Sequence, residues 1–247
     1  MKNVKVTISK DRLEAFMTIS DYNNLRLSDI VSAIQEAGLS YGIIGTNIKV
    51  IDLGGDFRFQ DVSIYEKWYK KEHIAKNVVN HFVYGLPELF RDKIKKANYI
   101  ANPGCYPTSA ILALAPIVNT DYFDLNSIVI NSLSGVSGAG RKATIDYSFC
   151  EVNESVKAYK IGNHQPSPEI ETILNDFSGK KINLIFVPHL IPVNRGIYTT
   201  IYLKPKVKIV IQKVRDIYNN YYKNSLFVRL FDSIPQLQDV VYTNFCD

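Results

Sequence analysis

The spacing of apolar residues changes along this chain, and the change constrains the fold more than any other feature. Residues 48–53 and 99–101 are short, nearly continuous apolar runs, which are typical of parallel strands buried on both faces. Residues 196–204 instead alternate, with Tyr198, Thr200 and Tyr202 on one side, as in an antiparallel sheet with one exposed face. We therefore expect an α/β region with a partial Rossmann-like parallel sheet in residues 45–104, followed by an α+β domain with a largely antiparallel sheet.

The N-terminal residues 1–44 have a different pattern. Alternation over 4–8 and 13–19 predicts two strands, and apolar residues at helical spacing over 27–34 predict a helix that Gly38 ends. Acidic and basic residues balance in this segment, and no motif in it indicates chemistry. We expect a small ββα module that serves packing or interaction.

The elements expected after residue 104 follow from the same reasoning. They are a helix over 105–118, strands over 127–132, 184–188 and 196–204, a helix over 207–222 and a short strand over 227–231.

Composition and charge exclude several classes of protein. The formal net charge of +5 comes from 29 basic and 24 acidic residues that are scattered, which argues against a nucleic-acid surface. The longest apolar stretch, 110–118, is about half of the ~20 residues that span a bilayer, and residues 1–5 lack the apolar core of a signal peptide. We expect a cytoplasmic protein with no nucleic-acid or membrane partner.

One of the three cysteines lies where a reactive thiol is expected. Cys105 follows a predicted strand and opens a predicted helix, preceded by Gly104 and followed by Pro107. At a helix N-terminus, unpaired N–H groups and the helix dipole favour a thiolate. The alternative is a buried structural cysteine. The spacing of Cys105, Cys150 and Cys246 fits neither a metal knuckle nor a disulfide framework.

Two further segments are candidates for the site. Residues 131–141 form a Gly/Ser-rich loop that ends in Arg141, whose amides are able to hold a phosphate or an oxyanion, although most such loops are only loops. His164 lies in a tight turn before a helix, where we expect an exposed imidazole that acts as acid or base. We expect His189 at the core or its rim, and His73 and His81 in solvent. The histidine spacing predicts no metal site.

In their order along the chain, these motifs resemble N-acetyl-gamma-glutamyl-phosphate reductase, a family of the semialdehyde dehydrogenase superfamily. The resemblance covers about residue 45 to residue 247. It depends on motifs at 51–58, 84–88, 101–108, 134–141, 159–170 and 186–196.

The resemblance implies a semialdehyde-dehydrogenase-type catalytic and dimerisation domain over 105–247, and a homo-oligomer. It implies Cys105 as the nucleophile and His164 as the acid/base. Cys105 would attack an acyl phosphate, and NADPH would reduce the thioacyl group to a semialdehyde, a step of arginine biosynthesis. The resemblance assigns substrate and cofactor (NADP) contacts to a further set of residues: Asn102, Ser137, Gly138, Arg141, Glu169 and Arg195.

The chain departs from the family pattern at three places. No GxxGxxG turn for the cofactor pyrophosphate precedes Gly45, and residues 1–44 instead resemble the N-terminal segment of the FapA family. The sequence stops at Asp247, before the family's last helix, and Pro166 stands where the family often has a second histidine. We expect a truncated reductase core that keeps acyl transfer but reduces its substrate poorly. The alternative is a catalytically inactive fusion fragment that acts as an interaction module.

Overall fold

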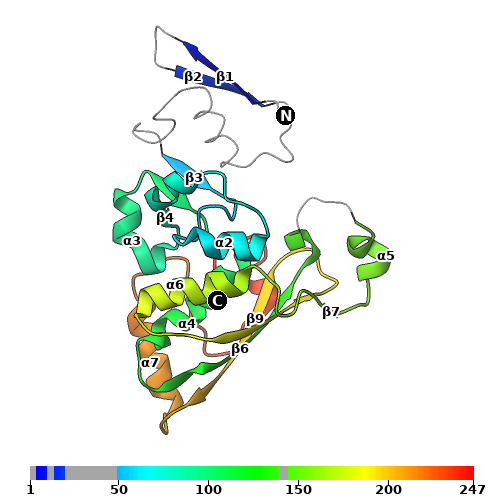
Figure 1. The fold of residues 1–247 in the computed structure, drawn as a ribbon. Helices are drawn as coiled ribbons and strands as arrows, with labels where there is room; N and C mark the ends of the chain where they lie inside the picture. Colours follow the sequence, from blue (N-terminus) through cyan, green and yellow to red (C-terminus); the bar gives the residue numbers. More distant parts are fainter. Residues whose placement is uncertain (1–3, 10–13, 20–48, 140–143) are drawn as a thin grey trace. The chain divides into compact units, whose positions relative to one another are not determined.

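The computed structural model describes residues 4–9, 14–19, 49–139 and 144–247 (Figure 1). The chain divides into two compact units, Met1–Pro103 and Gly104–Asp247. In the first unit, β1 (Val4–Ser9) and β2 (Glu14–Ile19) pair as an antiparallel hairpin, which confirms the two N-terminal strands. The predicted helix over 27–34 lies outside the described residues.

A three-stranded parallel sheet forms the centre of the first unit. Its strands are β3 (Val50–Asp52), β4 (Phe82–Tyr84) and β5 (Tyr99–Ala101), in the order β3-β5-β4. The apolar runs at 48–53 and 99–101 therefore pair directly, as predicted. The connections contain α2 (Val62–Tyr69), the 3-10 helix η1 (Lys76–His81) and α3 (Pro87–Lys96).

Aromatic residues pack against this sheet and hold a histidine in the core. Phe57 and Phe82 stack with 4.0 Å between ring centroids. The expectation that His73 is solvated is wrong, because only 2% of it is exposed. Its Nε2 lies 2.7 Å from the Asp56 carbonyl oxygen, and its Nδ1 accepts a hydrogen bond from the Ala75 N–H at 3.1 Å. Both ring nitrogens are thus satisfied by backbone groups.

The second unit contains a four-stranded mixed sheet. Its strands are β6 (Phe123–Ser134), β7 (Lys157–Ala158), β8 (Leu184–Leu190) and β9 (Ile197–Pro205), in the order β7-β8-β6-β9. The β6–β9 and β7–β8 pairs are antiparallel, as expected, but β6 and β8 are parallel. A parallel pair is possible here because α6 (Pro166–Ser178) lies in the connection between the two strands.

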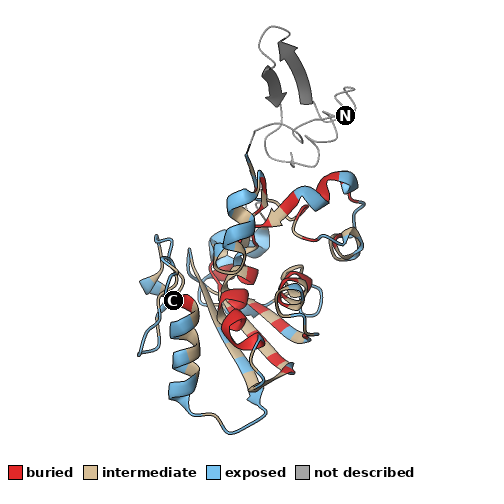
Figure 2. Cartoon of the chain, turned by 90° about the vertical axis from the view of Figure 1, so that its left-hand side faces the viewer, coloured by how far each residue is buried: buried red, intermediate tan, exposed pale blue. Residues whose placement is uncertain are grey.

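Two helices cover one face of this sheet. The α4 helix (Cys105–Val118) packs against α6, β6 and β9, and α6 packs against β8. Ten of the 14 residues of α4 are buried, and Figure 2 shows buried residues in this part of the chain and in bands across the strands. The remaining helices are α5 (Phe149–Val152), α7 (Ile211–Tyr222) and the 3-10 helices η2 (Val136–Ala139), η3 (Ile145–Tyr147) and η4 (Leu237–Asp239).

The C-terminal part differs from the expected pattern. The predicted helix over 207–222 begins only at Ile211, and residues 227–231 form no regular strand. Among the described residues this segment makes a single parallel bridge, between Val228 and Cys246. Residues 223–247 are therefore held mainly by side chains and turns.

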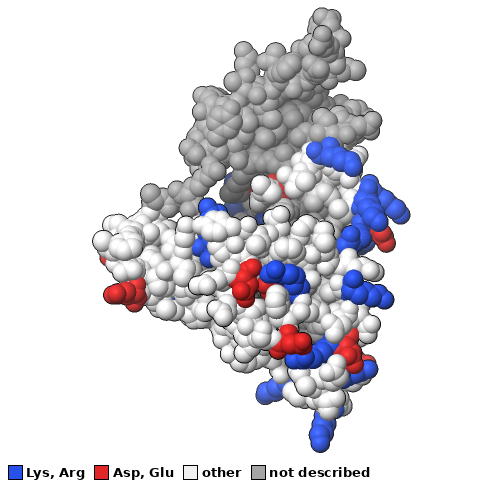
Figure 3. Space-filling view, turned by 180° about the vertical axis from the view of Figure 1, so that it is seen from behind, with Lys and Arg blue, Asp and Glu red and all other residues white. Residues whose placement is uncertain are grey.

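On the face shown in Figure 3, Lys and Arg side chains are mixed with Asp and Glu side chains. Within the ranges that the structure describes, no helix is long and apolar enough to cross a bilayer.

Candidate active site

Cys105 is the first residue of α4, which confirms its predicted place at a helix N-terminus. Gly104 is the N-cap residue, with φ −66° and ψ 152°, and its carbonyl accepts hydrogen bonds from the Thr108 N–H and Oγ1, both at 2.9 Å. The Cys105 side chain is exposed. Because the helix dipole is positive at this end, the position stabilises a thiolate.

A buried carboxylate holds the turn before Cys105. Glu169, on α6, is 1% exposed, and its Oε1 accepts the Gly104 N–H at 2.8 Å. The resemblance made Glu169 a substrate or cofactor contact. Its hydrogen bond to Gly104 fixes the backbone from which Cys105 projects, and its contact with substrate or cofactor stays a prediction.

His164 lies in an aromatic cage, and the expectation that it is exposed is wrong. It is 7% exposed and packs between Tyr106, Tyr159 and Phe186, with centroid distances of 5.5, 5.3 and 5.6 Å. Burial lowers the pKa of His164 to about 4, and the charge of Lys160 adds to this effect. The imidazole is therefore neutral at pH 7. It is able to accept a proton but does not stabilise a thiolate by charge.

Two tyrosines connect His164 to the start of α4. The hydroxyls of Tyr106 and Tyr159 lie 2.9 Å apart and share a hydrogen bond. Burial raises the pKa of both tyrosines, and the charge of Cys105 contributes in each case. Both phenols are thus protonated donors at neutral pH. Tyr106 follows Cys105 directly and contacts the His164 ring, so the predicted nucleophile and the predicted base share this neighbour.

The Gly/Ser-rich loop is built differently from the expected anion cradle. The N–H groups of Gly135, Val136 and Ser137 donate to the carbonyls of Gly196, Val193 and Asn194 at 2.9–3.0 Å. The Gly138 N–H donates to the Gly135 carbonyl at 3.2 Å. Since these amides are already used, the expectation that they are available to a phosphate is wrong for residues 135–138. Arg141 lies outside the described residues.

A cavity of about 640 Å³ opens beside Cys105. The start of α4, the loop with Ser137 and Gly138, strand β9 and the C-terminal segment form its walls. Ser109, on α4, and Ser132, on β6, both hydrogen-bond to Thr199 on β9, at 2.8 and 2.9 Å. These hydrogen bonds connect α4 and β9, which form two walls of the cavity, with β6.

The C-terminal segment was not predicted as part of the site. It contributes Pro235, Gln236, Leu237, Val240, Phe245, Cys246 and Asp247 to the cavity lining. In the sequence, the third cysteine was the only signal there that pointed to chemistry.

Two further predicted contacts, Arg195 and Asn102, make other interactions in this structure. Arg195 is exposed, and its guanidinium lies 5.4 Å from the centroid of the Tyr242 ring. Asn102 belongs to the first unit, where its N–H donates to the Asp52 carbonyl and its carbonyl accepts the Arg58 Nε–H, both at 2.8 Å. No group of three or more potential metal-ligating side chains occurs in the described ranges.

A parallel sheet followed by a mixed sheet covered by two helices is a fold that this chain shares with solved semialdehyde dehydrogenases. Solved structures agree. Aspartate semialdehyde dehydrogenase II of Vibrio cholerae, crystallised with ASA, gives a TM-score of 0.56 at 14% identity over 94% of this chain and 71% of that one. The Candida albicans enzyme with NADP gives 0.52 at 11% identity over 85% and 62%.

The chain belongs to the semialdehyde dehydrogenase family, whose model, described as "Semialdehyde dehydrogenase, dimerisation domain", matches residues 105–247. Three curated relatives of this chain share the name of one enzyme. Proteins named N-acetyl-gamma-glutamyl-phosphate reductase are 45% identical in Clostridium novyi, 42% in Halothermothrix orenii and 47% in Pelotomaculum thermopropionicum. These matches confirm the resemblance that the sequence motifs indicated.

The chain spans 65%, 65% and 58% of the length of these three relatives. The matches cover 89%, 89% and 81% of this chain. Residues 45–247 make up less than 89% of the chain. The similarity to the reductases therefore reaches into the segment before Gly45.

Proposed function

We propose that this chain reduces N-acetyl-gamma-glutamyl phosphate to the semialdehyde with NADPH, through a thioester on Cys105. The observation that carries the proposal is the exposed Cys105 at the start of α4, opening into the cavity. The names of the curated relatives support the choice of substrate.

In the first half of the reaction, the Cys105 sulfur attacks the acyl carbon, the bond from that carbon to the phosphate oxygen breaks, and phosphate leaves. The imidazole of His164 is neutral at pH 7, but a pKa of about 4 makes it a weak base for the thiol proton. The attack therefore relies on the thiolate that the start of α4 favours. The positive end of α4 stabilises the negative charge that develops on sulfur and on the acyl oxygen.

NADPH, when bound, supplies a hydride. The cavity fits a nicotinamide group, because Ile197, Leu237 and Val240 offer apolar surface while Ser137 and Gln236 offer polar groups for a carboxamide. In the second half of the reaction, the C–S bond breaks and the semialdehyde leaves. Cys105 then returns to the thiolate form that the helix N-terminus favours.

The reverse reaction tests this proposal. The chain is mixed with N-acetylglutamate semialdehyde, phosphate and NADP, and NADPH absorbance is followed. Cys105→Ser should abolish the signal, whereas Cys150→Ser, which changes another exposed cysteine, should keep it. Equal activity of the two variants, or no activity in the unchanged chain, would contradict the proposal.

We also infer that this chain self-associates through the face of its mixed sheet opposite α4 and α6. The name of the matched family, a dimerisation domain, supports this inference. Cross-strand neighbours on that face include Ile185, Val129 and Tyr202. Ile185 is 60% exposed and Tyr202 is 56% exposed. An uncovered apolar row of this kind is typical of a subunit interface.

Light scattering after gel filtration tests the assembly. Tyr202→Lys should shift the chain toward monomer, because it places a charge in the proposed interface. Val210→Lys, at a comparably exposed apolar position outside the sheet, is the control. A mass that the first variant leaves unchanged would contradict the inference.

A further inference from the structure

One acidic side chain lies in the wall of the Cys105 cavity. Among the described residues that line the cavity, Asp247 is the only acidic one, and none is Lys or Arg. The substrate class in the proposed function is an anion. An uncompensated carboxylate in this wall would therefore repel it.

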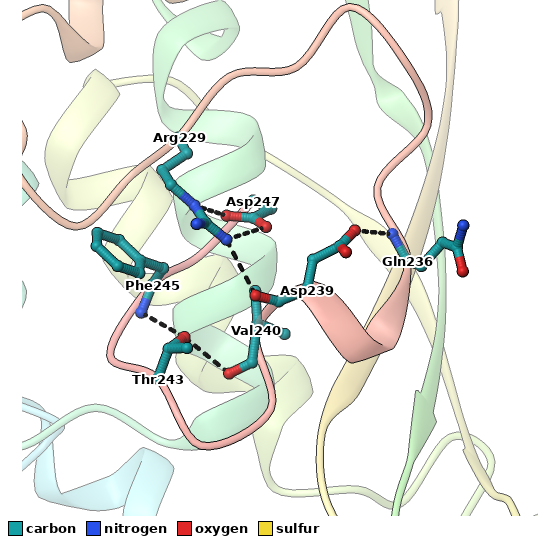
Figure 4. Close-up of polar contacts among 7 residues, drawn as sticks. All are labelled: Arg229, Gln236, Asp239, Val240, Thr243, Phe245 and Asp247. Atoms are coloured by element: carbon teal, nitrogen blue, oxygen red, sulfur yellow. Dashed lines mark hydrogen bonds and ion pairs between the residues drawn. The ribbon is translucent and has the colours of Figure 1, made fainter.

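Arg229 neutralises the Asp247 carboxylate through a bidentate ion pair (Figure 4). Its Nε and Nη2 donate to the Oδ1 and Oδ2 of Asp247 at 2.7 and 2.6 Å. The Asp247 side chain is only 3% exposed, whereas that of Arg229 is 35% exposed. Such a paired geometry is specific to a guanidinium.

Several other contacts fix Arg229 in this position. Its guanidinium lies 4.4 Å from the ring centroid of Phe245, which also lines the cavity, and 5.3 Å from that of Phe231. Its Nη2 donates to the Asp239 carbonyl at 3.1 Å. Its backbone N–H donates to the Cys246 carbonyl at 3.0 Å. Arg229 thus contacts the last residue of η4 and both neighbours of Cys246.

We propose that Arg229 is a positioning residue that makes the cavity accept anions, by neutralising Asp247 and fastening residues 245–247 into the wall. The inference rests on the proposed function only for the identity of the anion. The charge balance between Arg229 and Asp247 does not depend on which anion binds. It predicts opposite effects from removing the two partners, which a purely structural role does not.

Alkylation by two reagents of similar size and different charge tests the proposal. Cys105 reacts with neutral iodoacetamide or with anionic iodoacetate, and peptide mass mapping gives the rate at each cysteine. Cys246 lines the same cavity and provides a second reading. The ratio of the iodoacetate rate to the iodoacetamide rate reports the local charge.

Arg229→Gln leaves a negative charge and should lower the ratio about threefold, for a unit charge on the order of 10 Å away. Asp247→Asn leaves a positive charge and should raise the ratio by a similar factor. The double variant should return it to the starting value, and Arg229→Lys should keep most of it because the charge remains. Arg215→Gln is the matched control, since Arg215 pairs with Asp232, and neither residue lines the cavity.

A ratio that shifts in the same direction in Arg229→Gln and Asp247→Asn would overturn the proposal, because the two variants leave opposite charges behind. Loosening of the wall alone changes both alkylation rates alike and leaves their ratio unchanged. Unchanged ratios at Cys105 and Cys246 would overturn it as well. A low rate at Cys105 with both reagents, together with the predicted ratios at Cys246, would instead count against the proposed function alone.

Discussion

Replacing His164 with glutamine should remove much of the acid sensitivity of the folded second unit. The pKa of His164 is about 4 in the folded chain, mainly because of burial, whereas a free histidine has a pKa of about 6.5. Between these values the unfolded chain binds a proton that the folded chain excludes. Stability therefore rises with pH across this window, and it is lost as pH falls from about 6.5 toward 4.

The size of the effect follows from this difference in pKa. Lowering the pH from about 7 to about 5 should cost about 2 kcal/mol through this one group, and about 1 kcal/mol after allowance for solvent screening. Urea unfolding followed by circular dichroism measures the loss. Trp68, the only tryptophan, lies in the first unit, so its fluorescence serves as an internal reference.

The comparison is between pH profiles, because glutamine in the aromatic cage also lowers stability at pH 7. His164→Gln should flatten the profile, and His81→Gln, which changes an exposed histidine, should not. Parallel profiles for the unchanged chain and His164→Gln would refute the reasoning.

Two further substitutions test the geometry around Cys105. A Cβ on Gly135 would lie 2.8 Å from the backbone atoms of Asn194 and Arg195, so Gly135→Ala should lower the free energy of unfolding by about 1–3 kcal/mol; Gly179→Ala, where nothing lies within 4 Å but φ is +67°, gives the cost of backbone strain without crowding, and no loss at Gly135 would speak against crowding there. Glu169→Ala leaves the partly buried Gly104 N–H without its acceptor and should cost about 1–3 kcal/mol in urea unfolding while slowing iodoacetamide alkylation of Cys105; an unchanged alkylation rate would show that Glu169 does not position the thiol.

The sequence predicted the features that depend on local pattern. A strand, a glycine and a proline in the first helical turn were enough to place Cys105 at the start of α4, and the apolar runs were enough to predict the parallel sheet. Alternation in 196–204 likewise predicted the two faces of β9. In these cases the deciding interactions lie within a few residues of each other or repeat with a fixed period.

The features that the sequence missed depend on partners distant in the chain. The cage around His164 is made by Tyr106 and Phe186, which come from α4 and β8, so a polar turn gave no sign of burial. The amides of 135–137 are taken by carbonyls of 193–196. The ion pair between Arg229 and Asp247 was not predicted, because residues 227–231 were expected to form a strand. Each case is a tertiary contact that no local pattern encodes.

The central claim is that Cys105 is the nucleophile, and a single measurement tests it most directly. The chain is incubated with N-acetyl-gamma-glutamyl phosphate in the absence of nucleotide, quenched in acid, and analysed by intact mass and peptide mapping. The account predicts one acyl group on Cys105, with phosphate released in equal amount, and no acyl group on Cys150 or Cys246. Acylation of another cysteine, or phosphate release that Cys105→Ser leaves unchanged, would contradict it.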